Sequence, residues 1–237
     1  IQINTKGTFG IEIEVEGQNL LRAISGKWMD IVDGSLRGES REYILRKPLP
    51  LDQAKEAILH LKKALDANKS ILNFSFRTSV HVHVNVLEMD KEQIRTFLYL
   101  SHLFEDALVD YSGNSRVGNR FCLRCSDAEW KIGAMYAFFT SKGFRNLNED
   151  QLKYSAINLC PMMTQGSVEF RSMRGNLDSE ILFPWFDVLQ NIRNLSLIMT
   201  TKEIASEAVN QPETLINKVF GDYLTLFDYS GMKQDLK

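Results

Sequence analysis

Cysteine is scarce in this chain, whose 237 residues include only three. An odd count argues against a disulfide framework and favours a reducing compartment, so we expect a cytoplasmic protein. Cys122 and Cys125 form a Cys-x-x-Cys pair, but a structural zinc site needs two further ligands, and none is evident nearby in the sequence. We therefore expect these two residues to be unpaired structural thiols.

Long hydrophobic runs and an excess of basic residues are also missing. No apolar run approaches the roughly 18 residues of a membrane helix, so we expect no membrane partner. The formal net charge of −2 provides no basic field over the whole chain, which argues against a general nucleic-acid binder. A composition that is 44% hydrophobic and 24% charged is typical of a globular protein, and the oligomeric state stays open.

The segment Val80–Leu87 alternates strictly between apolar and polar residues, which is the period of a β-strand. Its valines would pack into a core, while His81, His83 and Asn85 share the opposite face. Two histidines two residues apart on one strand can direct their imidazoles into one small volume. This arrangement suits a metal ion or a phosphate, although both histidines could serve only cross-strand hydrogen bonds.

Two further segments, Phe9–Glu16 and Val168–Ser172, repeat this pattern with other polar residues. Their polar faces carry Glu12, Glu14 and Glu16 in the first segment, and Glu169 and Arg171 in the second. Carboxylates about 7 Å apart on one face repel each other unless they are solvated or bridged by cations. Each strand alone is consistent with a solvated face or with weak ion pairs. Three such strands in a chain with four histidines favour a functional site.

Helical spacing of apolar residues predicts helices between and after these strands. The expected helices cover Leu51–Asn68, Asp90 to about Tyr111, Asp127 to about Thr140, and about Ser179 to Met199, with shorter ones in the remainder. Short strands are expected near Glu42–Arg46, Asn73–Arg77 and Ser155–Leu159, with a turn at Gln165-Gly166 before a strand at Val168–Met173. Strands and helices do not alternate regularly. We therefore predict an α+β fold with helices packed on one face of an antiparallel sheet, in a single domain over residues 1–237.

Glutamates and histidines together are the ligand set expected of a Mg²⁺ or Mn²⁺ site that also handles phosphate. Arginines could clamp phosphate oxygens beside such a site. The arginines considered are Arg77, Arg116, Arg120, Arg124, Arg171 and Arg174. The sequence has no Walker A motif, no dinucleotide-binding glycine motif and no nucleophile elbow. A bound nucleotide would therefore be held largely through metal ions and arginines.

Four motifs follow one another along the chain. They are Phe9-Gly10-Ile11-Glu12-Ile13-Glu14, Asp33-Gly34-Ser35-Leu36, His81-Val82-His83-Val84 and Ser167-Val168-Glu169-Phe170-Arg171. As an ordered set they resemble the putative amidoligases, a family of the glutamine synthetase/glutamate–cysteine ligase superfamily of carboxylate–amine ligases. The resemblance covers about residues 9–194, and residues from about 195 to 237 would form a C-terminal helical extension.

This resemblance implies a glutamine synthetase-like catalytic domain, whose curved antiparallel sheet holds ATP and two or three divalent cations, Mg²⁺ or Mn²⁺, on its concave face. It implies a ligase that joins a carboxylate and an amine in an amide or peptide-like bond through an acyl phosphate intermediate. The metal ligands implied are Glu12, Glu14, Glu42, His81 and Glu169. Arg171, with Glu169, would be catalytic and would lie at the transferred phosphoryl group. The residues expected near ATP, phosphate or substrate are His83, Arg116, Arg120 and Lys153, with Arg174 as a further phosphate clamp.

The segment Gly38–Ile44, after the Asp-Gly-Ser turn, departs from the pattern of the family, so Glu39 is an alternative to Glu42 as a ligand. His102 lies in a segment rich in leucine and phenylalanine and is expected to be a hydrogen-bonded core or boundary residue. The same Glu/His cluster could instead serve a metal-dependent hydrolase or phosphotransferase, or a non-catalytic nucleotide-binding module on a degenerate ligase fold. The sequence identifies neither the acid nor the amine.

Overall fold

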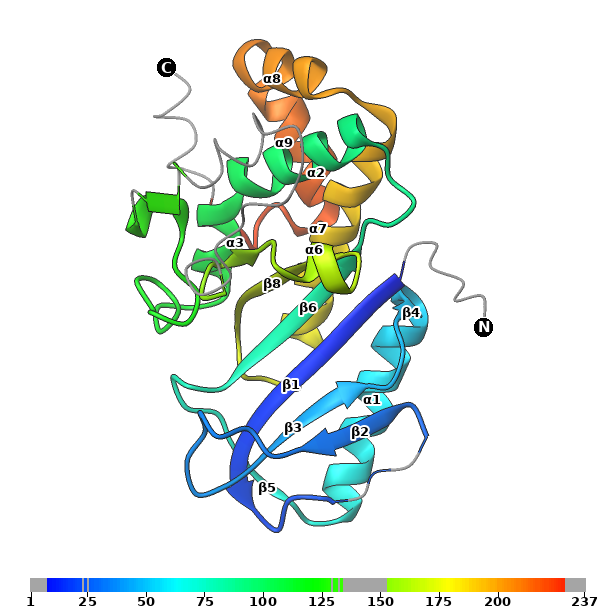
Figure 1. Ribbon diagram of the computed structural model, residues 1–237, viewed down its shortest axis with the longest axis vertical. Coiled ribbons are helices and arrows are strands. Elements are labelled where there is room, and N and C mark those ends of the chain that lie inside the picture. The colour runs from blue at the N-terminus through cyan, green and yellow to red at the C-terminus, as the bar shows by residue number, and fades with distance from the viewer. Residues whose placement is uncertain are drawn as a thin grey trace.

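One antiparallel sheet forms the centre of the fold, with strands in the order β2-β3-β1-β6-β8-β7 (Figure 1). The computed structural model describes residues 8–22, 24, 26–128, 130, 131, 133 and 153–228. Its strands are β1 Thr8–Gln18, β2 Trp28–Ile31, β3 Glu39–Leu45, β4 Leu49–Pro50, β5 Ile71–Asn73, β6 Ser79–Asn85, β7 Ile157–Asn158 and β8 Ser167–Arg174. β4 and β5 pair with the two ends of β1, and all these strand pairs are antiparallel. The predicted α+β fold class is therefore confirmed.

The helices fall mostly where the apolar spacing predicts them. They are α1 Leu51–Ala67, α2 Lys91–Leu103, α3 Glu105–Tyr111, α6 Pro161–Thr164, α7 Ser179–Ile198, α8 Thr201–Asn210 and α9 Pro212–Phe220, with the 3₁₀ turns η1 Cys125–Asp127 and η2 Gly221–Tyr223. Asp90 caps α2 by accepting the Gln93 N–H, and Asp178 caps α7 by accepting the Glu180 N–H. Within the described ranges, no helix combines the length and the apolar character needed to cross a membrane.

Alternation along the strands divides the sheet into an apolar face and a polar face. Ile11, Ile13 and Val15 of β1 are at most 1% exposed, and the valines of β6 at the same face are fully buried. Figure 1 shows α1 and part of α7 behind the sheet, on the side of this core. Phe170 of β8 packs edge-on against Trp185 of α7, with 6.3 Å between ring centroids. The polar side chains are thereby left on the opposite face.

The predicted helix from Asp90 to Tyr111 is divided in two at Phe104. Phe104 is fully buried and packs edge-on against Phe220 of α9, with 5.3 Å between ring centroids. Its φ of −105° and ψ of 11° depart from helical values. The prediction of a continuous helix was therefore wrong. The sequence has no helix-breaking residue at this position, and the break comes from the tertiary packing of the Phe104 ring.

Other expected elements are displaced or lie outside the described ranges. The strand expected at Asn73–Arg77 instead covers Ile71–Asn73, where it pairs with the end of β1, and β2 was not predicted. The short helix α6 precedes the turn expected at Gln165-Gly166, where Gly166 adopts a φ of +67° that favours glycine. The helix expected from Asp127 to Thr140 falls largely outside the described residues, as do the last nine positions of the C-terminal extension, 229–237.

A β-bulge interrupts β8 opposite His81. Val82 pairs with Phe170 whereas Val80 pairs with Met173, so one residue of β6 faces two residues of β8. The extra residue returns Met173 to the apolar face, where it is fully buried. Because of the bulge, the apolar side chains of β8 face the core both before and after Arg171.

Candidate active site

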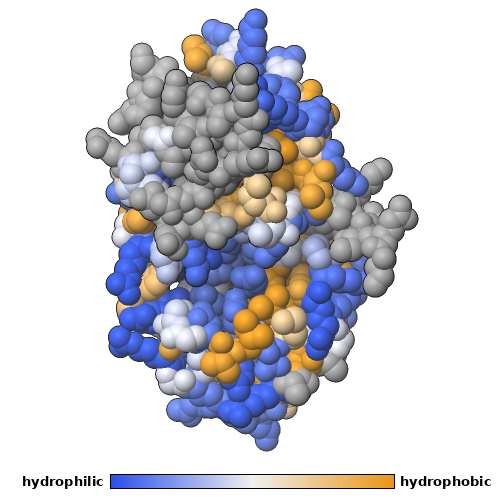
Figure 2. All heavy atoms as spheres, in the orientation of Figure 1, coloured by the Kyte–Doolittle hydropathy of each residue, from blue (hydrophilic) through white to orange (hydrophobic). Residues whose placement is uncertain are grey.

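Strand register places the polar residues of β3, β1, β6 and β8 in rows on the open face of the sheet. The rows pair Glu14 with Glu42, Glu12 with His81, and His83 with Glu169. In the orientation of Figure 1, the space-filling view of Figure 2 shows hydrophilic residues over the middle of this side of the molecule. The sequence predicts separate polar faces, and the register brings them together on one surface.

Glu12, Glu42 and His81 form a first group of potential metal ligands, with one ligand atom of each within 4.8 Å of the others. The Ser79 hydroxyl donates to Glu14 Oε2 at 2.5 Å, so Ser79 Oγ must accept from His81 Nε2, 2.7 Å away. Toward Glu12 Oε2, 3.3 Å away, Nδ1 would then present a lone pair in the neutral ring and a hydrogen in the protonated ring. A cation between these two atoms would stabilise this arrangement.

Glu12, His83 and Glu169 form a second group, again within 4.8 Å of one another. His83 Nε2 lies 3.3 Å from Glu12 Oε1 and 3.9 Å from Glu169 Oε1. These contacts lack hydrogen-bond geometry, and among the described residues the buried Nε2 has no hydrogen-bond partner. Burial lowers the pKa of His83, but the close contact with Glu12 and the negative charges of Glu169 and Glu12 outweigh it and raise the pKa on balance. The structure thus places His83 beside a potential cation position, and Glu12 is common to both groups.

The negative charge of this cluster is only partly balanced in the protein without cations. Burial raises the pKa of Glu12, but the close contacts with His81 and His83 and the charges of these two rings outweigh it and hold the pKa well below its ordinary value. Burial, followed by the charges of Glu12 and Glu14, raises the pKa of Glu42 to about 8. Glu42 therefore carries a proton at neutral pH, and a cation that binds there must displace it.

The stability of the cation-free protein is expected to fall between about pH 5 and pH 8 because of Glu42. The folded state keeps the Glu42 proton up to a pKa of about 8, whereas the unfolded state releases it near 4.5. Since the folded state binds more protons, rising pH favours unfolding, by at most about 1.4 kcal/mol per pH unit. Urea unfolding in the presence of a chelator measures this slope, and Glu42→Gln should reduce it.

Glu39→Gln is the matched control for this measurement. Glu39 lies on the same strand but on the opposite face from Glu42, and its carboxylate accepts the backbone N–H groups of Asn19 and Leu20. The structure therefore brings Glu42, and not Glu39, to the ligand cluster. The control should keep the pH slope of the unaltered protein, and an unchanged slope in Glu42→Gln would contradict the prediction.

Glu169 is held on both sides by polar side chains. Its Oε1 pairs with Arg171 Nη1 at 2.5 Å, and its Oε2 accepts a hydrogen bond from Asn158 Nδ2 of β7 at 2.6 Å. Burial raises the pKa of Glu169, but the charges of Arg171, His81 and His83 outweigh it, so the pKa is lowered. The carboxylate thus stays ionised at neutral pH, with the guanidinium of Arg171 at the edge of the cluster.

Arg116 is 1% exposed and binds the backbone of the β8 bulge. Its Nε donates to the Ser172 carbonyl at 2.9 Å, and its Nη2 donates to the Arg171 carbonyl at 2.7 Å. Its Nη1 is buried and has no hydrogen-bond partner among the described residues. Arg116 therefore positions Arg171 through the backbone, and its Nη1 could still bind a further group.

Four other predicted residues lie outside the two ligand groups. Glu14 accepts the Ser79 hydroxyl but is a member of neither group. Arg120 and Lys153 are exposed, and each places its cationic group over the aromatic ring of the residue that follows it. Arg174 donates to the Tyr111 carbonyl at 3.2 Å. The structure therefore places Glu14 beside the two ligand groups, and it does not bring Arg120, Lys153 or Arg174 to them.

Two further arginines considered as phosphate clamps also bind protein groups. Arg124 forms ion pairs with Asp106 and Asp127, both near 3.0 Å. Arg77 donates to the Ser35 carbonyl in the Asp-Gly-Ser turn at 3.2 Å. Neither arginine contacts the ligand cluster in the described part of the chain.

Three polar residues contribute to the site although the sequence analysis predicts no site role for them. Ser79 links Glu14 to His81, Asn158 orients Glu169, and the charge of Asp33 contributes to the raised pKa of Glu42. Ser79 could have been found, because it precedes His81 by two positions and shares its face. Asn158 could not, because it reaches Glu169 only through the pairing of β7 with β8.

A cavity of about 210 Å³ opens beside the cluster, with Glu12 and His83 in its wall. Other lining residues include Lys47, Asn85 and Gln165. The cavity thus connects the ligand cluster with amide groups and a basic residue, and a small polar molecule could occupy it.

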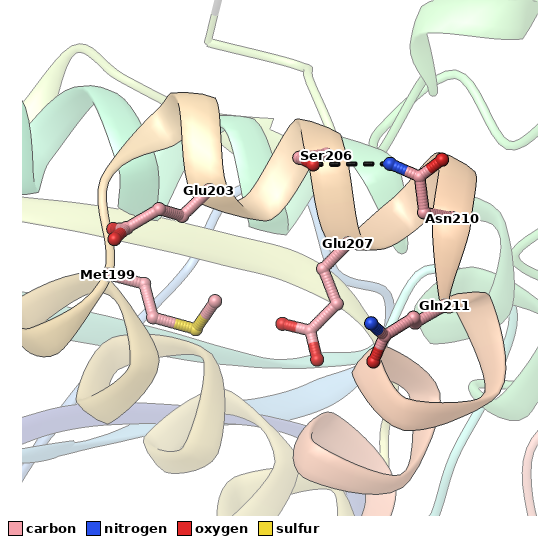
Figure 3. Close-up of a pocket in the computed structure, with 6 residues that line it drawn as sticks. All are labelled: Met199, Glu203, Ser206, Glu207, Asn210 and Gln211. Carbon is pink, nitrogen blue, oxygen red and sulfur yellow. Dashed lines mark hydrogen bonds between the residues drawn. The ribbon is translucent and has the colours of Figure 1, made fainter.

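A second cavity, of about 330 Å³, lies at α8 and shares no lining residue with the first (Figure 3). Its two carboxylates already have partners, because Glu203 accepts from Thr200 and Glu207 pairs with Lys218 at 2.6 Å. These contacts cap α8 and join it to α9. We therefore assign no binding function to this cavity.

The comparison with known families agrees with the ordered motifs. The family model described as putative amidoligase enzyme matches residues 26–192, which is more than half of the 237-residue chain. No curated protein sequence matches the chain. The matched range contains Glu42, His81, His83 and Glu169, and it begins after Glu12. On this match, the chain belongs to the family of putative amidoligase enzymes.

Proposed function

We propose that this protein is an ATP- and Mg²⁺-dependent carboxylate–amine ligase that acts through an acyl phosphate intermediate. The observation that carries the proposal is the pair of ligand groups that share Glu12, next to Arg171. Adjacent divalent cations and an arginine are the groups that phosphoryl transfer from a nucleotide requires. Membership of a family of putative amidoligase enzymes supports the same reaction class. We place the chain, on the same grounds, with the glutamine synthetase/glutamate–cysteine ligase superfamily.

The two ligand groups fit Mg²⁺ or Mn²⁺. Carboxylate oxygens are hard donors that suit both ions, and an imidazole in each group is also tolerated. The unpartnered Nε2 of His83 and the raised pKa of Glu42 both favour a site that is completed by positive charge. Glu12, Glu42 and His81 would hold one ion, and Glu12, His83 and Glu169 the other. When bound, such ions would neutralise charge on the nucleotide phosphates.

In the proposed reaction, a carboxylate oxygen of the acid attacks the γ-phosphorus of ATP, the bond to the β-phosphate oxygen breaks, and ADP leaves. The amine nitrogen then attacks the acyl carbon, phosphate leaves, and the nitrogen loses a proton as the amide forms. Arg171 would donate hydrogen bonds to the transferred phosphoryl group, and Arg116 would hold Arg171 in place through the bulge. The exposed Arg120 and Lys153 are candidates for contacts with the nucleotide phosphates, and Arg174 for a phosphate contact if it releases Tyr111.

The cavity beside Glu12 and His83 is our proposed position for the acid substrate. It adjoins both ligand groups, so a carboxylate bound there would lie next to the cations. Lys47 is exposed at its edge and forms no ion pair with any described residue. Its ammonium group could therefore bind a second carboxylate, which favours a dicarboxylic acid, including an acidic amino acid, as substrate.

Release of ADP and phosphate by the full chain tests the proposed function. The protein, ATP and MgCl₂ are incubated with a panel of carboxylic acids, each with and without an amine. We expect release that requires acid, amine and divalent cation together, and a product with the mass of acid plus amine minus water. Turnover without an amine or without a nucleotide would instead indicate a phosphotransferase or hydrolase. ATP binding without turnover would indicate a nucleotide-binding module.

A further inference from the structure

A third group of potential metal ligands lies outside the candidate active site, where α2, α3 and η1 meet. His102 is in the last turn of α2, Glu105 begins α3, and Cys125 begins η1. One ligand atom of each residue lies within 4.8 Å of the other two. The group combines an imidazole nitrogen, a carboxylate oxygen and a thiol sulfur, and none of these residues is part of the Glu12 cluster.

The ring of His102 is oriented as in a metal-binding histidine. Its Nδ1 lies 2.7 Å from the Leu98 carbonyl, which can only accept, so Nδ1 carries the hydrogen. Burial lowers the pKa of His102 and outweighs the charge of Glu105, so the ring is neutral at pH 7 and Nε2 has a lone pair. This Nε2 is buried and has no hydrogen-bond partner in the described part of the chain. A backbone carbonyl that fixes the tautomer in this way is typical of histidines that bind metal through the other nitrogen.

The other two ligands are held close to His102 by the backbone. Glu105 is 4% exposed, and its Oε2 accepts the N–H of Cys125, 20 residues further along the chain, at 2.7 Å. Burial, followed by the charge of Glu105, raises the pKa of Cys125 to about 12, so its side chain is a thiol without a cation. Lys131, which is 1% exposed, lies 3.3 Å from Glu105 Oε1 and supplies a counter-charge in the metal-free protein.

We propose that His102, Glu105 and Cys125 form a binding site for a borderline-soft divalent cation of the Zn²⁺ class. Zn²⁺ accepts nitrogen, oxygen and sulfur donors in one site, whereas Mg²⁺ prefers oxygen alone. On binding, the thiol of Cys125 loses its proton to solvent and a metal–sulfur bond forms. Three protein ligands leave one position for water, and the lone pair on His102 Nε2 gains its partner.

The proposed site would hold the loop that carries Arg116. This loop, residues 112–124, runs from the end of α3 to the start of η1, so a metal at Cys125 would tie its far end to α2 and α3. Arg116 in turn binds the bulge of β8. The metal would therefore stabilise the supports of Arg171 without contact with substrate, and its existence does not depend on the proposed ligase reaction.

Co²⁺ provides a specific test, because a bond from Co²⁺ to a thiolate gives an intense near-ultraviolet charge-transfer absorption. The ligands of the candidate active site contain no sulfur, so they cannot produce this band. We expect the full chain to develop the band on addition of one equivalent of Co²⁺ and to lose it when Zn²⁺ is added. Cys125→Ser should abolish the band, whereas Cys160→Ser, the control, should retain it. His102→Gln should weaken Co²⁺ binding about tenfold or more.

Alkylation of the unaltered protein is a second test, which does not depend on whether a variant folds. Zn²⁺ should protect Cys125 from N-ethylmaleimide and leave the rate at Cys160 unchanged, as measured by peptide mass spectrometry. The proposal is overturned if the unaltered protein shows no band, if Cys125→Ser keeps it, or if Cys125 reacts equally with and without Zn²⁺. Lys131 would then be the counter-ion that Glu105 requires.

Discussion

Replacing Glu12 with glutamine is expected to remove both bound Mn²⁺ ions and to lower turnover about 10³-fold or more. Glu12 is the residue shared by the two ligand groups of the candidate active site. Its Oε2 lies 3.3 Å from His81 and its Oε1 lies 3.3 Å from His83, so each oxygen serves a different group. The glutamine amide keeps the shape but has no charge, and its NH₂ group would face one of the two cation positions. One position therefore loses its oxygen ligand, and the other keeps only a neutral oxygen in place of a charged one.

The loss of free Mn²⁺ signal in electron paramagnetic resonance measures how many ions bind to this variant. Glu16→Gln is the matched control, because Glu16 lies on the same face of β1 and is 7% exposed. Glu16 Oε1 accepts the Arg37 N–H at 2.9 Å, and a glutamine oxygen can accept it equally well. The control should bind Mn²⁺ and turn over normally. Full Mn²⁺ binding and turnover by Glu12→Gln would contradict both the shared-ligand geometry and the proposed reaction.

Arg171→Lys is expected to lower kcat by about 10²- to 10³-fold while Mn²⁺ binding changes little. Lysine can keep a positive charge near Glu169, with which Arg171 now pairs at 2.5 Å. It cannot present the planar set of N–H donors that binds several phosphoryl oxygens together. The effect should therefore fall on the transfer step and not on cation binding, which is the opposite of the result expected for Glu12→Gln.

Steady-state kinetics and Mn²⁺ titration on the same preparation separate these two effects. Arg95→Lys is a suitable control, because Arg95 lies on α2 and pairs only with Glu92 among the described residues. It should match the unaltered protein in both measurements. Equal loss of kcat and of Mn²⁺ affinity in Arg171→Lys would show that Arg171 acts by holding Glu169, and the proposed contact with the phosphoryl group would be wrong.

Much of the fold could be predicted from local patterns. Strict alternation at Val80–Leu87 and Phe9–Glu16 located β6 and β1, and helical spacing located α1 and α7 within a residue or two. The break at Phe104 could not be predicted in this way. No local residue marks the break, and the backbone departs from helical values where the Phe104 ring packs against Phe220 of α9. Packing between distant segments has no periodic signal in the sequence.

The candidate site was predictable in its residue types but not in its pairings. The alternation places Glu12, His81 and Glu169 each on the polar face of its strand. Register decides which of them meet, and it depends on cross-strand packing and on the bulge of β8. The strand register placed His83, which was expected near metal or phosphate, in a ligand group together with Glu12 and Glu169. It also left Arg120 and Lys153 exposed, where the sequence had predicted contacts with ATP or substrate.

The sequence by itself determined the two-faced strands, the main helices and the membership of the putative amidoligase family, because each depends on short-range periodicity or on an ordered set of motifs. The tertiary structure alone decided that Glu12 joins two ligand groups and that Arg116 binds the bulge beside Arg171. It also brought His102 to Cys125, two residues that the sequence presents as a core histidine and an unpaired thiol. The physical reason is that ligand geometry needs atoms a few ångströms apart. Chain segments reach that distance only through strand register and helix packing.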